Sequence, residues 1–145
     1  MKLSSTIIIS QVFNEKKQCE IDPTRLKDVQ VLGENMANLR GYLDLAFKSI
    51  MNSVLMCPHI LCEAFSVLKE LALQYFPDQR EICYSVISGF VFLRFFAPAI
   101  LNPKLYDITD QPIDPVVNRT LTLISKTIQT LGNLVSSKCV SLIQI

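Results

Sequence analysis

The chain has 145 residues, half of them hydrophobic, which suffices for one domain with a buried core and excludes a disordered polypeptide. Its 14 basic and 13 acidic side chains leave a net charge of +1, so we expect no nucleic-acid partner and no polybasic attachment to a membrane. The five cysteines include no CxxC pair, and we interpret them as reduced thiols of a cytosolic protein, with Cys57, Cys62 and Cys83 in apolar core segments.

Helical periodicity dominates the sequence, and it begins with a predicted helix over about residues 4–17. Asp22-Pro23 predicts a turn in the connection that follows. A second helix is predicted over about residues 34–56, because apolar residues recur there at steps of three and four.

A third helix is predicted to start at Pro58, because the amide hydrogen that proline lacks would be unused in a first turn. This helix is expected to end near Phe76. Asp78 is a candidate N-cap for a fourth helix, which Asn102-Pro103 would end.

The segment over residues 104–115 contains Pro112 and Pro115 and predicts an ordered loop. A fifth helix is predicted over about residues 116–136, and an apolar, uncapped segment follows it. The sequence contains no internal repeat and no low-complexity linker. We therefore expect a single all-α domain of about five helices over residues 1–145.

The fourth predicted helix is apolar on every face, and Arg94 is the one charged residue between Ile82 and Pro103. A helix of this kind is either central to a bundle or spans a membrane. We favour the bundle and expect no transmembrane segment, because a span would place Arg94 deep in hydrocarbon and Pro98 would break it.

A charge within an apolar helix requires a partner, because an unpaired buried charge costs several kcal/mol. Pro98 cannot donate a backbone hydrogen bond, so the carbonyl of Arg94 four residues earlier is expected to lose its helical partner. Two interpretations stay open on these residues: Arg94 pairs with a buried carboxylate for stability, or it serves a functional loop.

The fifth predicted helix carries a polar stripe opposite its apolar face. At 100° per residue, Thr122, Lys126, Gln129 and Asn133 lie within about 60° of one another. Most amphipathic helices simply present such a face to water. A stripe with two amides and one lysine is also suited to a hydrogen-bonding contact with a partner protein.

Machinery for independent catalysis is missing from the sequence. The glycines are isolated and form no phosphate-binding loop, and His59 has no nucleophile beside it in a suitable context. With a single histidine we expect no metal site, and we expect no cofactor.

Three segments carry a resemblance to a known family. Phe92-Leu93-Arg94, followed by Pro98-Ala99-Ile100 and Pro103, resembles the signature of Ras GTPase-activating domains. Residues 119–131, which read RTLTLISKTIQTL, are similar to the subgroup that also carries C2 and pleckstrin-homology domains. The segment Cys19-Glu20-Ile21-Asp22-Pro23 fits the same family, and the similarity covers about residues 11–138.

The resemblance implies an all-α domain that docks on a Ras-family small GTPase in its GTP state. It implies that Arg94 braces the loop that carries the arginine finger, without touching the nucleotide. It assigns Lys126, Gln129 and Asn133 to the Ras-contacting helix. Leu93 and Pro98 match positions that shape the binding groove and its floor.

One part of the family pattern is not found in these residues. The finger loop of such domains lies upstream of the signature, with a motif similar to Phe-Arg-Gly/Ala-Asn/Thr-Ser/Thr-Leu. Nothing between Met1 and Arg94 resembles it, since Arg25 and Arg40 do not lie in a suitable loop. We therefore expect a partial domain that contains no catalytic residue of its own.

The sequence predicts a cytoplasmic activator of Ras-family GTPases, weak or inactive in this form and not itself a hydrolase. Domains outside the chain would be needed to place it at the inner face of the plasma membrane. The alternative is a finger-less module that binds GTP-loaded small GTPases without stimulating hydrolysis.

Overall fold

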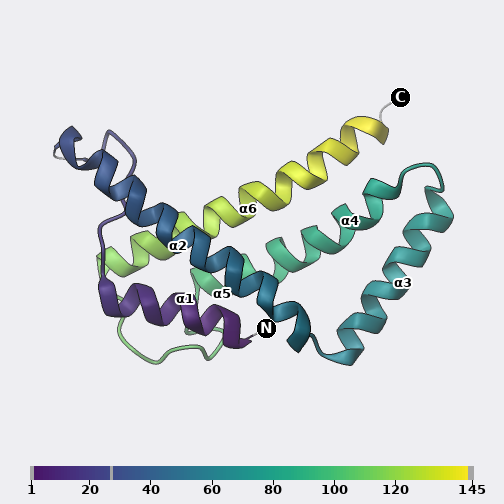
Figure 1. The fold of residues 1–145 in the computed structure, drawn as a ribbon, viewed down its shortest axis with the longest axis horizontal. Coiled ribbons are helices and arrows are strands. Elements are labelled where there is room, and N and C mark those ends of the chain that lie inside the picture. The colour runs from purple at the N-terminus through teal and green to yellow at the C-terminus, as the bar shows by residue number, and fades with distance from the viewer. Residues whose placement is uncertain (1, 27, 144–145) are drawn as a thin grey trace.

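The computed structural model of the chain describes residues 2–26 and 28–143, and within them every regular element is a helix (Figure 1). The prediction of an all-α fold is therefore confirmed. The main helices are α1 (Lys2–Glu15), α2 (Leu32–Asn52), α3 (His59–Tyr75), α4 (Arg80–Gly89), α5 (Ala97–Leu101) and α6 (Pro115–Ile143). Two short 3-10 helices, Val29–Val31 and Ser53–Met56, flank α2, and a π-helix, Phe90–Phe96, joins α4 to α5.

The helices form a body with a projecting hairpin (Figure 1). In the body, α1 packs along α2, and α6 packs against α1, α2 and α5. At one end α3 and α4 form the hairpin, and α4 also packs against α6.

The hydrophobic core lies where α1, α2, α5 and α6 meet. The apolar face of α6 supplies its largest share, because positions spaced by three and four residues turn to the same side. The fully buried members on this helix are Val117, Leu121, Ile124 and Ile128. Core members from the other helices include Ile8 and Val12 of α1, Ala46 of α2 and Ile100 of α5. Burial of each such aliphatic side chain contributes about 1.5–3 kcal/mol.

The stretch from Arg80 to Leu101 is one continuous helix, as predicted, but it is not the buried centre of a bundle. By length and a mean hydropathy of 1.7 this stretch could cross a membrane, and 28% of its most apolar window is buried. Core helices of soluble proteins meet the same criterion. Phe96, Ala97 and Ile100 enter the core, whereas Tyr84 is 71% exposed because no described element covers that side of α4.

One predicted detail of the helix ends is corrected by the structure. Asp78 does not cap α4: it lies in the turn before it, and Gln79 takes the N-cap position without a side-chain hydrogen bond. By contrast, Asp114 caps α6, since its Oδ1 accepts from the N–H of Val117 at 2.9 Å. The adjacent Lys16 contacts Asp114 at 2.8 Å and holds the pKa of that carboxyl below its usual range.

The cysteines are free thiols among the described residues, but only part of the predicted core assignment is correct. Cys83 is buried as expected, and so is Cys19. Cys62 is exposed and Cys57 is half-buried, because the start of α3 carries them away from the core. Apolar sequence neighbours therefore did not guarantee burial here.

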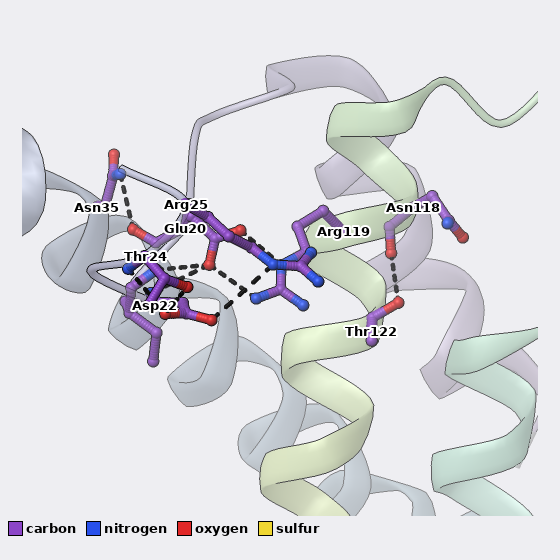
Figure 2. Close-up of polar contacts among 9 residues, drawn as sticks. Glu20, Asp22, Thr24, Arg25, Asn35, Asn118, Arg119 and Thr122 are labelled. Atoms are coloured by element: carbon purple, nitrogen blue, oxygen red, sulfur yellow. Dashed lines mark hydrogen bonds and ion pairs between the residues drawn. The ribbon is translucent and has the colours of Figure 1, made fainter. Parts of the chain in front are cut away.

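The connection between α1 and α2 is fastened to α6 by a bidentate ion pair (Figure 2). Arg119 donates from Nε to Oε2 of Glu20 and from Nη2 to Oε1, both at 2.7 Å. The Glu20 side chain is only 15% exposed. The hydrogen bonds from Arg119 lower the pKa of Glu20, and the N–H groups of Ile21 and Asp22 add to this effect.

Two asparagine side chains of α2 also bind this connection. The side-chain amide of Asn35 donates to the backbone carbonyl of Glu20 at 2.8 Å (Figure 2), and the side-chain amide of Asn38 donates to the backbone carbonyl of Gln18 at 3.1 Å. The connection is thus held by α2 on one side and by α6 on the other. It fixes the N-terminal end of α6 relative to α2.

Loss of the ion pair is expected to destabilise the fold. Arg119→Ala would leave a mostly buried carboxylate without its cation, and we expect the free energy of unfolding to fall by about 2 kcal/mol at pH 7. Urea unfolding followed by circular dichroism measures this. The matched control is Arg25→Ala, which removes a 61% exposed side chain 3.9 Å from Asp22 and should change stability by less than about 0.5 kcal/mol.

The effect depends on pH with a defined sign. The pKa of Glu20 is lower in the folded chain than its unfolded value of about 4.3, so its stabilisation is fully present above that pH. It is lost as the pH falls through the folded pKa. The gap between wild type and Arg119→Ala should therefore close in acid; a gap that is constant down to about pH 2 would contradict this role.

Candidate functional site

The predicted polar stripe lies on α6, on a side that the core does not use. Lys126 and Asn133 are exposed, whereas Gln129 and Thr122 are half-buried. Thr122 donates to the carbonyl of Asn118 at 2.8 Å, within the same helix (Figure 2). Lys126 forms no ion pair with a residue in the described part of the chain, so its charge is available to an external partner.

Gln129 is linked to the neighbouring helix through a buried hydroxyl. Its Nε2 donates to Oγ of Ser125 at 3.4 Å, and Ser125 in turn donates to the carbonyl of Ala97 at 2.9 Å. Ser125 is fully buried, so leaving its hydroxyl or the carbonyl unpaired would be costly. This chain of hydrogen bonds joins the stripe to the first residue of α5.

The signature segment adopts a π-helix rather than an α-helix. In it the N–H of Ala97 donates to the carbonyl of Phe92, five residues earlier. The π-helix ends at Phe96, two residues before Pro98, whose ring would clash with the preceding turn of a regular α-helix. The wider π-turn relieves this clash, and π-turns of this kind are frequent at functional sites.

Leu93 is brought against α6 at a glycine. A Cβ atom on Gly132 would lie 2.8 Å from Cδ2 of Leu93 and 3.3 Å from Cβ of Phe92. The two helices can therefore approach this closely because residue 132 has no side chain. Leu93 and Pro98 are both half-buried, in the helix that packs on α6.

Arg94 lies at the surface, which corrects the prediction of a buried charge. Its side chain is exposed, and it forms no ion pair or hydrogen bond with the residues the structure describes. The reason is that no described element packs over that side of the π-helix, so water solvates the guanidinium. A structural pairing of Arg94 with a buried carboxylate is not found in the described part.

The site has no arrangement for metal binding or nucleophilic catalysis among the described residues. No three His, Cys, Asp or Glu side chains converge there. His59 lies in an exposed pair with Glu63, with Nδ1 3.3 Å from Oε1, at the start of α3 and distant in sequence from the stripe. What the site offers is a contact surface with hydrogen-bonding groups and one unpaired lysine.

Sequence reasoning identified the stripe but not the residues that hold it in place. Ser125 and Gly132 were missed, because each is unremarkable until the helix opposite is known. A signal existed for both: a small residue on the buried side of a long amphipathic helix marks a place where another backbone approaches closely.

The family comparison identifies the chain's class. Residues 27–133 match the family described as GTPase-activator protein for Ras-like GTPase. The match covers well over half of the chain, and the all-helical fold agrees with it. The chain therefore belongs to the family of Ras GTPase-activating domains, whose members regulate GTPases.

Individual relatives agree with this class. The chain is 54% identical over 131 residues to a GTPase-activating protein of Drosophila melanogaster, matching 90% of this chain and 11% of the relative. It is 49% identical over 133 residues to the Ras GTPase-activating protein 3 of Bos taurus, which covers 92% of this chain and 16% of that protein. For the human Ras GTPase-activating protein 2 the identity is 42%, with the same coverage. The chain thus spans about a sixth or less of these relatives.

The contact at Gly132 can be tested by a pair of glycine substitutions. Alanine normally stabilises a helix interior by about 1 kcal/mol relative to glycine. Gly41→Ala in α2 meets nothing within 4 Å and should show this gain. Gly132→Ala should instead lower the free energy of unfolding by about 1 kcal/mol, because Leu93 and Phe92 must move. Equal gains for both variants in urea unfolding would contradict the close approach.

Proposed function

We propose that this chain is the GTPase-contacting part of a Ras GTPase-activating domain, and that it binds Ras-family small GTPases in their GTP state. Lys126, Gln129 and Asn133 on α6 are assigned to the contact surface. Leu93 and Pro98 shape the adjoining groove, and Arg94 braces the loop that carries the arginine finger. The regulator supplies a surface, and the hydrolytic chemistry belongs to the GTPase.

The observation that carries this proposal is the attachment of the signature helix to the polar stripe. Ser125 bonds the Ala97 carbonyl at 2.9 Å and accepts from Gln129, while Gly132 admits Leu93. Two segments that match the family in sequence are thus joined in space. A stripe that merely faced water would need no such connection to the signature helix.

We also propose that these 145 residues stimulate hydrolysis weakly or not at all when they act without other polypeptide. For Ras and its activators, a finger arginine supplied in trans is known to accelerate hydrolysis by about 10³–10⁵-fold. Arg25 lies in the turn after α1, where its Nε is 3.9 Å from Asp22, and Arg40 lies on α2. Neither arginine lies in a segment that resembles the finger motif, whereas the exposed side of Arg94 is open to a further loop.

The proposed location is the cytoplasm, where small GTPases act on membrane surfaces. The apolar helix Arg80–Leu101 stays outside the bilayer in this proposal, because α6 and α3 pack along it and Arg94 would be costly in hydrocarbon. Attachment to the plasma membrane would come from domains other than this one.

Binding to Ras is the first test. Titration of Ras loaded with a non-hydrolysable GTP analogue, compared with Ras·GDP, should show preference for the GTP state. Lys126→Ala should weaken this binding about tenfold, since it removes the one charge of the stripe. Lys69→Ala, an exposed lysine on α3, is the matched control and should bind as wild type does.

Single-turnover GTP hydrolysis is the second test. The chain added to Ras·GTP should raise the rate far less than the factor that a finger supplies, and full acceleration would overturn the finger part of the proposal. Failure to bind Ras in either nucleotide state would overturn the proposal itself. Binding to GTP-loaded Rho-type proteins instead of Ras would favour the finger-less binding module.

A further inference from the structure

A concave surface lies beside the polar stripe, between α2 and α6. We call it the α2–α6 groove; its volume is about 470 Å³. The helices α2 and α6 cross in this region (Figure 1), and Ile21 of the connection after α1 also lines the groove. The side chains that matter for the argument are Ile21, Leu39, Phe47, Leu123, Lys126 and Leu131.

The groove has a buried apolar floor and an exposed apolar rim. Leu39 and Leu123 form the floor and are 7% and 9% exposed. Ile21 and Leu131 lie on the rim and are each 37% exposed. An incoming apolar side chain would remove these rim carbons from water and would rest on a floor that is already packed.

Among the described residues that line the groove, Lys126 alone is charged. It also belongs to the polar stripe, so the groove and the stripe form one continuous surface. Its ammonium has no carboxylate partner among the described residues. The groove therefore suits an occupant that presents an apolar side chain next to a carboxylate.

We infer that the contact with the GTPase extends from the stripe across this groove onto α2 and the connection after α1. The occupant is an apolar side chain of the Ras-like GTPase with an acidic neighbour that pairs with Lys126. This inference rests on the proposed function, and it adds Ile21 and Leu131 as contact residues. Attachment of the connection through Glu20 and Arg119 keeps Ile21 in place.

The test measures the affinity of the full 145-residue chain for Ras loaded with a non-hydrolysable GTP analogue. Ile21→Ser and Leu131→Ser each remove a partly exposed apolar side chain and should weaken binding about tenfold. The control is Leu55→Ser in the 3-10 helix Ser53–Met56, where Leu55 is 91% exposed; this variant should leave the affinity unchanged. Unfolding midpoints of the variants separate a lost contact from a lost fold.

Thr130→Glu provides a variant that leaves both Ile21 and Leu131 intact. Thr130 is exposed and lies four residues after Lys126, so a glutamate there pairs with the ammonium and competes with the partner's carboxylate. Its expected effect is again a loss of about tenfold, and this loss should shrink as salt is added.

The outcomes distinguish the groove from the stripe. Weaker binding by Lys126→Ala together with the groove variants supports the inference. Lys126→Ala alone could weaken binding, while Ile21→Ser, Leu131→Ser and Thr130→Glu all bind with wild-type affinity. That result overturns the inference that the GTPase contacts the groove, and it leaves the proposed function standing. Absence of binding by the unmodified chain overturns both.

Discussion

The helix α6 both supplies the centre of the core and carries the polar stripe, and the rest of the molecule depends on this constraint. α1, α2, α4 and α5 all pack on this helix, and its buried face supplies the centre of the core. Because a helix places residues 100° apart, the same 29 residues can seal a core and still present a separate polar stripe. Any displacement of α6 would therefore move the candidate contact surface and the core together.

Two attachments set the position of α6, one at each end of the described contact region. Near its start, Arg119 holds Glu20 and with it the connection between α1 and α2. Farther along, Ser125 bonds the Ala97 carbonyl and Gly132 admits Leu93. The first attachment is an ion pair that acid weakens, whereas the second depends on packing and a neutral hydrogen bond. They are thus sensitive to different conditions.

Several features could be predicted from the sequence because their physics is local. Apolar spacing placed the helices. The fifth helix, predicted to end near residue 136, continues to Ile143 and so enters the apolar segment that was expected to follow it; the side chains of that segment, from Cys139 on, are not among the described ones. Amide and lysine spacing identified the stripe of Lys126, Gln129 and Asn133. Asp78 failed as a cap because the choice between neighbouring turn residues depends on how α3 meets α4.

Burial was decided by the tertiary structure. Arg94 sits in an apolar run, yet it is exposed, because no described helix covers its side of the π-turn. Cys62 is exposed for the same kind of reason. The sequence by itself determined which faces are apolar, where most helices begin and end within a few residues, and which family the motifs resemble. Only the tertiary structure decided which apolar faces are covered and which small residues let two helices touch, because both depend on contacts between residues far apart in the chain.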